Sequence, residues 1–349
     1  MKTILFTGGG SAGHVIPNLA LIEELLSETE IKVCYMGTKG IEKGLVAEWD
    51  IPFYEIECPK LIREKSWSAI QKNLHIPVEF HRAKQQALDG LTRLKPDVVF
   101  SKGGYVSLPV VWAAKKLNIP CFSHESDFSP GLANRLSARK CRYVFTSFPE
   151  TAKRIPHGKY SGAPLRRSIF NATRAESRKA LSIPFHSKVL LIFGGGSGSK
   201  AINDAVRSHL KELTEEYYVL HVCGKGNRVE TNLKNYRQFE FIADMAMAYA
   251  CADLVISRAG AGTLFELMAL KKRSILVPLQ GQTRGDQVEN AAYFEDKGLC
   301  RVVKQDHLFT LPQAIKETLA DEQMYERLQE NAFRSGNEII LSELKKALR

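Results

Sequence analysis

The sequence predicts an α/β protein of two Rossmann-like domains, each built on a doubly wound parallel sheet. Two glycine-rich turns carry this prediction, one at residues 8–13 and one at residues 194–198. Each turn follows a short apolar run and precedes a helical pattern, which is the strand–loop–helix opening of a nucleotide-binding unit. The chain of 349 residues is also longer than one compact core usually allows. We therefore expect two domains that face each other across a cleft.

Short apolar segments bounded by glycine, proline or polar residues mark the strands of the first domain. They lie at residues 4–7, 32–36, 97–101, 120–123 and 143–146. Helical patterns at residues 17–27 and 108–117 lie between them, and this alternation is typical of a parallel sheet with crossover helices. The strand at 97–101 leads into another glycine turn.

The second half of the chain repeats the alternation. Strands are predicted at residues 189–193, 218–223, 239–241, 254–257 and 274–278, with one of the intervening helices at 263–270. Residues 161–166 contain glycine and proline without periodicity, as expected of an interdomain linker. We therefore predict an N-terminal domain over residues 1–161 and a C-terminal domain over residues 162–334.

The composition is that of an ordinary globular protein with a basic surplus. Hydrophobic residues make up 44% and charged residues 25% of the chain. The net charge of +11 indicates an acidic partner, such as a phosphorylated substrate, an anionic membrane surface or nucleic acid. The seven cysteines form no CxxC pair, so we expect reduced thiols in a cytoplasmic protein. The chain starts at a predicted strand and has no apolar run near about 20 residues, so we expect neither a signal peptide nor a membrane-spanning helix.

The first turn has the G-x-G-x-x-G spacing at Gly8, Gly10 and Gly13. Such glycines let backbone N–H groups approach a phosphate at a helix N-terminus. A dinucleotide site also needs an acidic residue at the end of the second strand, and residues 35–39 contain none. This argues against a nicotinamide-dependent oxidoreductase. A glycine turn that serves only helix–strand packing remains an alternative.

His14 follows this turn at the predicted carboxyl edge of the sheet, where ligands bind in such folds. A neutral imidazole there can accept a proton or orient a hydroxyl. A histidine that only packs or caps the helix is the alternative.

Five separated motifs extend over nearly the whole chain. They read GGGSAGHVIP at 8–17, SKGGYVS at 101–107, HESD with PGLAN at 124–134, SRAGAGTLFE at 257–266 and GDQVEN at 285–290. In this order they resemble the MurG family, bacterial glycosyltransferases that add N-acetylglucosamine to lipid I and so make lipid II. The resemblance implies the GT-B fold, with a C-terminal helix at about residues 335–349 that packs back on the first domain.

The resemblance also implies how the donor, UDP-N-acetylglucosamine, is held mainly on the second domain. The helix that opens at residue 261 would present its N-terminus to the diphosphate, and the carboxylate of Glu266 would bind the two ribose hydroxyls. Glu266 as an ordinary polar helix residue is the alternative. The implied donor set is Arg166, Gly196, Ser197, Ile242, Ala261, Gly262, Thr263, Leu264, Phe265, Glu266, Gln287 and Asn290.

The family reaction is an inverting transfer in which the muramyl 4-hydroxyl attacks the anomeric carbon and UDP leaves. His14 is the first candidate for the general base, and Glu125 or Asp127 the second. The acceptor side is expected to use Ser11, Ala12 and Gly13 at the seam with the donor, Gly103, Gly104 and Tyr105 at the acceptor pyrophosphate, and Asn134. The chain has no Asp-x-Asp motif of metal-dependent transferases, so we expect neither a metal nor another cofactor.

The chain departs from the family pattern in two places. Gly196 aligns with a phosphate-contacting serine of many relatives and Ser197 comes next, so either residue is a candidate for that contact. Asp127 stands where many relatives have asparagine, and it could bind a hydroxyl or take a proton.

A basic and apolar segment lies at residues 60–95, where eight Lys or Arg residues outnumber three acids. Such a segment suits an anionic bilayer surface. Two amphipathic helices that pack on the sheet, the second starting at Pro77, are the alternative. We expect a peripheral enzyme at the cytoplasmic face of the bacterial cell membrane and no nucleic-acid partner. The interleaved apolar residues are Leu61, Ile62, Trp67, Ile70, Leu74, Ile76 and Phe80.

Other GT-B enzymes are the nearest alternatives, namely a glycolipid glycosyltransferase or a UDP-N-acetylglucosamine 2-epimerase. An epimerase would bind the same nucleotide but would need neither a lipid acceptor site nor the basic segment.

Overall fold

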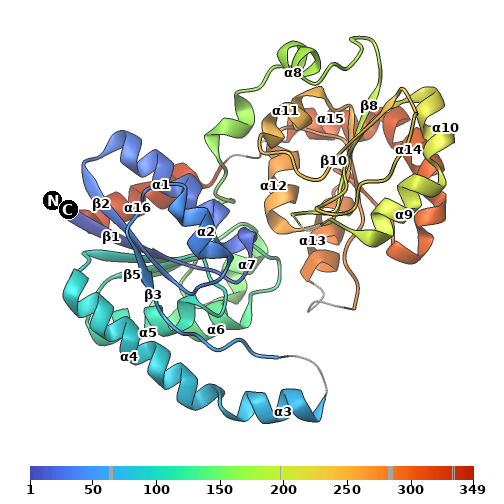
Figure 1. Ribbon diagram of the computed structural model, residues 1–349. Coiled ribbons are helices and arrows are strands. Elements are labelled where there is room, and N and C mark those ends of the chain that lie inside the picture. Colours follow the sequence, from blue (N-terminus) through green and yellow to red (C-terminus); the bar gives the residue numbers. More distant parts are fainter. Residues whose placement is uncertain (63–65, 197, 282–285, 332, 334) are drawn as a thin grey trace. The chain divides into compact units, whose positions relative to one another are not determined.

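The computed structural model describes residues 1–349 except 63–65, 197, 282–285, 332 and 334. The chain divides into two compact units (Figure 1). Unit 1 comprises residues 1–166 and 335–349, and unit 2 comprises residues 167–334. Each unit has its own parallel sheet and contains one of the two glycine-rich turns.

Unit 1 is built on a seven-stranded parallel sheet with the strand order β3-β2-β1-β4-β5-β6-β7. Its strands are β1 (Lys2–Thr7), β2 (Ile31–Gly37), β3 (Phe53–Glu55), β4 (Val98–Ser101), β5 (Cys121–Glu125), β6 (Tyr143–Thr146) and β7 (Gly158–Tyr160). Its helices are α1 (Ile16–Glu28), α2 (Ile41–Ala47), α3 (Trp67–Leu74), α4 (Ile76–Leu94), α5 (Ser107–Lys116), α6 (Leu132–Ser137), α7 (Pro149–Arg154) and α16 (Asn337–Leu348). Short 3-10 turns lie at Ala12–His14 and Ala138–Lys140.

Helices cover both faces of this sheet (Figure 1), so its central strands are apolar on both sides. Alternate residues of a strand point to opposite faces. Ile4 and Phe6 of β1 therefore join the buried cluster that includes α1 and α16, whereas Leu5 joins the cluster that includes α4 and α5.

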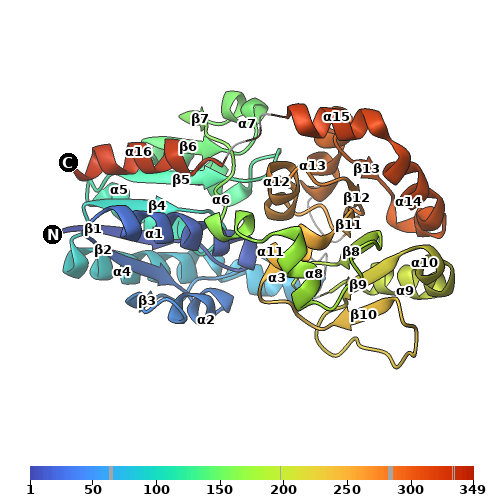
Figure 2. The same ribbon diagram turned by 90° about the horizontal axis from the view of Figure 1, so that it is seen from above.

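The last helix, α16, belongs to unit 1 although it follows unit 2 in the sequence. Its apolar residues Ile340, Leu341 and Leu344 are buried in the same cluster as α1, and it runs beside α1 (Figure 2). Asn337 at its start donates from Nδ2 to Leu165 O at 2.9 Å and accepts from Leu165 N at 3.0 Å. These bonds link the start of α16 to the end of the segment 1–166 of unit 1.

Unit 2 is built on a six-stranded parallel sheet with the order β10-β9-β8-β11-β12-β13. Its strands are β8 (Val189–Phe193), β9 (Tyr218–Val222), β10 (Tyr236–Phe239), β11 (Leu254–Ser257), β12 (Ser274–Leu276) and β13 (Arg301–Val302). Its helices are α8 (Arg174–Ala180), α9 (Lys200–Ser208), α10 (Leu210–Glu216), α11 (Met245–Cys251), α12 (Ala261–Ala269), α13 (Asp286–Glu295), α14 (Leu311–Ala320) and α15 (Glu322–Glu330), with 3-10 turns at Arg167–Phe170 and Gln305–Thr310. Leu190 and Ile192 of β8 pack with residues of α9, α10 and α14 in its main core.

The predicted α/β fold with two doubly wound parallel sheets is confirmed. The strand predicted at residues 239–241 was wrong in position, because β10 ends where that prediction began. Three strands were not predicted, namely β3, β7 and β13. They are two or three residues long and lie at sheet edges, so they carry too little apolar pattern to stand out.

Two further features follow from the described residues. None of their helices is both long and apolar enough to cross a membrane. All seven cysteines are free thiols, and six of them are buried.

Candidate functional site

Candidate site residues gather where the strand order reverses in each sheet. In unit 1 the reversal lies between the neighbours β1 and β4, and in unit 2 between β8 and β11. Ligands of open parallel sheets bind beyond the carboxyl ends of the strands at such a point. The turn at residues 8–13 follows β1 and the turn at 194–198 follows β8, so both glycine-rich turns lie at a reversal.

In unit 1, the glycine turn at residues 8–13 lies in close contact with the glycine turn that follows β4. Gly10 has φ 81°, and a Cβ there would lie 2.5 Å from the ring of Tyr105. Gly104 has φ 79°, and its Cβ would lie 2.5 Å from Gly9 O and 3.0 Å from His14 Nδ1. Only glycine suits these two positions, because they combine a left-handed backbone with contacts too close for a side chain. Gly9, Gly104 and His14 are thereby brought together, as are Gly10 and Tyr105.

The imidazole of His14 is oriented by the first turn. Its Nδ1 lies 3.1 Å from Gly9 O and 3.0 Å from Ser11 Oγ. A carbonyl oxygen can only accept, so the contact with Gly9 O favours the neutral tautomer that carries its proton on Nδ1. The lone pair of that ring is then on Nε2, which is the atom able to take a proton from a substrate.

Glu125 and Asn134 brace the loop that follows β5. Glu125 is 4% exposed, and its carboxylate accepts from Asp127 N at 3.0 Å, Gly131 N at 2.7 Å and Asn134 Nδ2 at 2.9 Å. Asn134 is also buried and accepts from Ser123 Oγ at 2.9 Å. Both oxygens of Glu125 are therefore engaged with its own loop, and Asp127 is the more accessible carboxylate of the pair.

A buried cation, Lys102, lies beside this loop. It is 1% exposed, and its ammonium donates to Ser126 Oγ at 2.5 Å. Burial lowers its pKa to about 8, against the opposing attraction of Glu125 and Asp127. No carboxylate forms an ion pair with it within the described ranges.

His124 is fully buried and has a role different from that of His14. Its Nε2 lies 3.1 Å from Gly162 O. Burial, together with the charge of Lys102, holds its pKa well below the usual range. His124 is therefore neutral and serves the packing of the loop.

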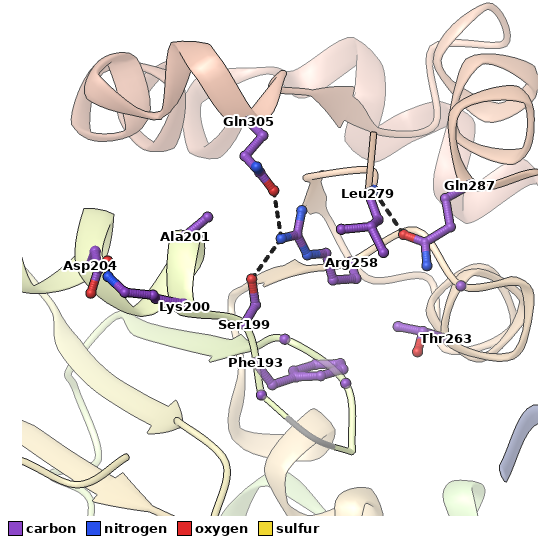
Figure 3. A pocket seen from close by; sticks show the side chains of 14 residues that line it. Phe193, Ser199, Lys200, Ala201, Asp204, Arg258, Thr263, Leu279, Gln287 and Gln305 are labelled. Atoms are coloured by element: carbon purple, nitrogen blue, oxygen red, sulfur yellow. Dashed lines mark hydrogen bonds and ion pairs between the residues drawn. The ribbon is translucent and has the colours of Figure 1, made fainter. Parts of the chain in front are cut away.

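Unit 2 contains a pocket of about 630 Å³ at its own strand reversal (Figure 3). The loop after β8 and the start of α9 form one wall, and the loop after β11 with the start of α12 forms another. The lining residues are Phe193, Gly194, Gly195, Gly198, Ser199, Lys200, Ala201, Asp204, Arg258, Gly260, Thr263, Leu279, Gln287 and Gln305.

The pocket is built to receive an anion. The guanidinium of Arg258 donates to Ser199 Oγ and Gln305 Oε1, both at 2.7 Å (Figure 3). It also donates to Val277 O at 3.1 Å. These bonds fix the guanidinium in the pocket. The N-termini of α9 and α12 also open here, and helix N-termini favour negative charge. Lys200 also lines the pocket; it is highly exposed and forms an ion pair with Asp204, which lines the pocket too.

Two of the residues predicted for the donor line this pocket, Thr263 and Gln287. Gln287 Oε1 accepts from Leu279 N at 3.0 Å, which links the first turn of α13 to the backbone shortly after β12. Ala261 and Gly262 form the first turn of α12 with Thr263. Leu264 and Phe265 are fully buried, and Leu264 N donates to Gly260 O at 3.0 Å within the helix.

The other predicted donor residues are more scattered. Glu266 lies on α12 and accepts from Tyr249 OH at 2.9 Å, and Asn290 of α13 is fully buried. Ile242 lies in the loop after β10, and Gly196 is exposed; neither lines the pocket. Arg166 belongs to unit 1, at the junction with unit 2. Ser197 lies outside the described residues.

Sequence reasoning did not assign a role to several residues that the structure brings to these sites. Arg258, Ser199 and Gln305 converge in the pocket, while Lys102 and Glu42 lie beside the turns of unit 1. A signal existed for Arg258, which stands between a buried strand and a glycine at the ligand-binding edge. Gln305 and Glu42 had no such sequence signal, because only the folding of the chain brings them to these sites. The described residues hold no cluster of three or more His, Cys, Asp or Glu suited to a metal ion.

Comparison with known proteins defines the class of the chain. The N-terminal domain of glycosyltransferase family 28 matches residues 4–146, and the C-terminal domain of that family matches residues 189–344. With its two parallel sheets, the chain is a glycosyltransferase of the GT-B fold.

More specific relatives are UDP-N-acetylglucosamine–N-acetylmuramyl-(pentapeptide) pyrophosphoryl-undecaprenol N-acetylglucosamine transferases. That of Clostridium perfringens is 46% identical over 87% of this chain and 86% of its own length. That of Lachnospira eligens is 41% identical over 93% of both chains. The crystal structure of Acinetobacter baumannii MurG superposes with a TM-score of 0.77 at 26% identity, covering 99% of this chain and all of that one. The chain belongs to this transferase family, the MurG family.

Proposed function

We propose that this protein transfers N-acetylglucosamine from UDP-N-acetylglucosamine to the muramyl 4-hydroxyl of lipid I, with inversion at the anomeric carbon. The product is lipid II, the precursor for peptidoglycan synthesis and thus for cell wall growth, cell shape and division. The observation that carries the proposal is the anion-binding pocket of unit 2, formed by Arg258 and two helix N-termini in a chain of this family.

The donor end of the reaction is assigned mainly to unit 2. The diphosphate of UDP fits the pocket, because Arg258 and the starts of α9 and α12 offer positive charge to an oxyanion. The same groups stabilise the charge that develops as UDP leaves. Glu266 is assigned to the ribose hydroxyls, and Gln287 and Asn290 to the sugar. Ile242 is assigned to uracil, and Arg166, Gly196 and Ser197 to the phosphates.

The acceptor end is assigned to unit 1. His14 Nε2 takes the proton of the attacking hydroxyl, since the contact of Nδ1 with Gly9 O favours the tautomer that leaves the lone pair on Nε2. Asp127 is the second candidate, because Glu125 is occupied by three donors of its own loop. Backbone groups at residues 11–13 and 103–105 are assigned to the acceptor diphosphate and muramyl sugar.

A membrane-facing surface on α3 and the start of α4 is a further part of the proposal. We call it the α3 patch and define it as Leu61, Trp67, Ile70, Leu74 and Val78. Trp67 is 82% and Leu74 71% exposed, and large apolar side chains gathered at a surface usually mark an interaction site. The basic residues Lys72 and Arg82 are exposed beside them, which favours an anionic lipid surface.

Not all apolar residues of this segment belong to the α3 patch. Phe80 packs edge-on against Trp112 with ring centroids 5.7 Å apart, and the ammonium of Lys140 lies 4.1 Å from the Trp112 ring centroid. These residues stabilise the packing of α4 on α5. The α3 patch therefore supports peripheral binding, which we assign to the cytoplasmic face of the cell membrane where the nucleotide sugar is available.

The test is transfer of label from radiolabelled UDP-N-acetylglucosamine to lipid I in detergent with EDTA. We expect label in the lipid fraction, and loss of transfer in His14→Ala with donor binding retained. The exposed His186→Ala is the matched control and should keep full activity. UDP release or epimerisation of the free sugar nucleotide, without transfer to lipid, would instead assign the chain to an epimerase or to another acceptor.

A further inference from the structure

The side chain of Glu42 is buried beneath the first glycine turn, where no substrate can reach it. Glu42 is on α2 and is fully shielded from solvent. Its Oε1 accepts from Thr38 N at 3.0 Å and from Thr38 Oγ1, and its Oε2 accepts from Gly10 N at 3.1 Å. Three donors on two oxygens match an ionised carboxylate, which only accepts.

Glycines make the space that holds this carboxylate. A Cβ at Gly9 would lie 2.5 Å from Glu42 Cδ, one at Gly37 2.9 Å from Cγ, and one at Gly40 2.8 Å from Oε2. Contacts this close mean that a side chain at any of the three positions would displace Glu42. The end of β2, the start of α2 and the turn after β1 are thus shaped around one charged group.

The turn held by Glu42 is the turn that orients His14. Gly10, whose N–H binds Glu42, directly follows Gly9, whose carbonyl lies 3.1 Å from His14 Nδ1. From the other side, Tyr35 OH donates to Gly8 O at 2.7 Å. Tyr35 therefore donates to Gly8, and Glu42 accepts from Gly10. These two bonds from buried side chains fix the orientation of the Gly9 carbonyl.

We propose that Glu42 is a positioning residue for the general base: it fixes the Gly9–Gly10 backbone and thereby holds His14 in the tautomer with its proton on Nδ1. This inference rests on the proposed function of His14. It predicts that the effect of Glu42 on transfer passes through His14 and not through binding of the donor.

Glu42→Gln is the most informative substitution, because it preserves size and removes one acceptor. The amide oxygen of glutamine can serve either Thr38 or Gly10, and its NH2 group then faces a donor on the other side. We expect kcat to fall by about 10- to 100-fold, the usual effect of losing a hydrogen bond to a charged group. KM for UDP-N-acetylglucosamine should stay unchanged. Glu48→Gln removes one exposed charge just beyond α2 and should leave kcat as it is.

A double-mutant cycle separates positioning from general damage to the fold. In a His14→Ala background, Glu42→Gln should lower the residual kcat by less than about threefold, because the group it positions is gone. An equal loss in both backgrounds would overturn the proposal. Thr38→Val, which removes the hydroxyl that donates to Glu42 and accepts from Gly40 N at 3.3 Å, gives a milder second variant and should also lower kcat.

The ring of His14 provides a readout that does not need transfer activity. Histidine ¹⁵N shifts report the tautomer, and among nine histidines the signal of His14 is the one missing from His14→Ala. In the wild type we expect a neutral ring protonated at Nδ1, and in Glu42→Gln a mixture of tautomers. A His14 tautomer unchanged in folded Glu42→Gln would overturn the proposal, whereas absence of transfer by the wild type would contradict only the proposed function.

Discussion

Lys102→Met is expected to stabilise unit 1 at neutral pH. Lys102 is 1% exposed and its ammonium donates to a single hydroxyl, that of Ser126. Burial disfavours the charged form and outweighs the attraction of Glu125 and Asp127. Methionine has a similar length and no charge, so it removes this cost while it fills the same space.

The magnitude follows from the pKa of Lys102, which is lowered from 10.5 to about 8. At about 1.4 kcal/mol per pKa unit, the protonated side chain destabilises the folded state by about 3 kcal/mol. Below pH 8 both the folded and the unfolded state hold the proton, so the wild type carries the full cost. Between pH 8 and pH 10.5 the unfolded state binds more protons than the folded state, and wild-type stability therefore rises with pH. The advantage of Lys102→Met should shrink by about 2–3 kcal/mol between pH 7 and pH 10.

Urea unfolding followed by tryptophan fluorescence measures this effect in unit 1, the unit that contains Lys102. All three tryptophans, Trp49, Trp67 and Trp112, belong to unit 1. Lys116→Met, which removes an exposed lysine of α5, is the control and should show no pH-dependent difference from the wild type. The reasoning is refuted if Lys102→Met is less stable than the wild type at pH 7, or if their difference is the same at pH 7 and pH 10.

Two further predictions concern the pocket and the α3 patch. Arg258→Ala should lower kcat/KM for UDP-N-acetylglucosamine by about 10- to 100-fold, because a fixed, charged donor to the diphosphate is lost. Arg258→Lys should not restore kcat/KM, since one ammonium cannot reach Ser199, Gln305 and Val277 together. If steady-state kinetics give Arg258→Ala a donor affinity near the wild-type value, the assignment of Arg258 to the diphosphate is contradicted. Trp67→Glu combined with Leu74→Glu should weaken sedimentation with anionic vesicles while transfer to a short-chain soluble acceptor continues. Phe185→Glu, at a phenylalanine of unit 2 that is 66% exposed, is the control. Vesicle binding unchanged in the double variant would show that the α3 patch does not face lipid.

Residues that are buried because they are apolar were predictable from the sequence. Residues whose role depends on partners far along the chain were not. The central strands were found because a parallel sheet covered on both faces requires continuous apolar runs. His14 was singled out because it follows a glycine turn, but the Gly9 carbonyl that sets its tautomer is seen only in the folded turn. Asn134 stays a predicted substrate contact, and the bonds of its amide to Ser123, His124 and Glu125 are seen only in the folded chain.

By itself, the sequence determined the α/β class, the two glycine turns and the placement of both at the ligand-binding edges, because these depend on short-range patterns of apolar residues and glycine. Only the tertiary structure decided that Glu42 and Lys102 are buried beside the turns of unit 1 and that Arg258 meets Ser199 and Gln305 in unit 2. The physical reason is the same in each case. The cost or benefit of a charged side chain depends on which groups surround it, and those groups come from segments far apart in the chain.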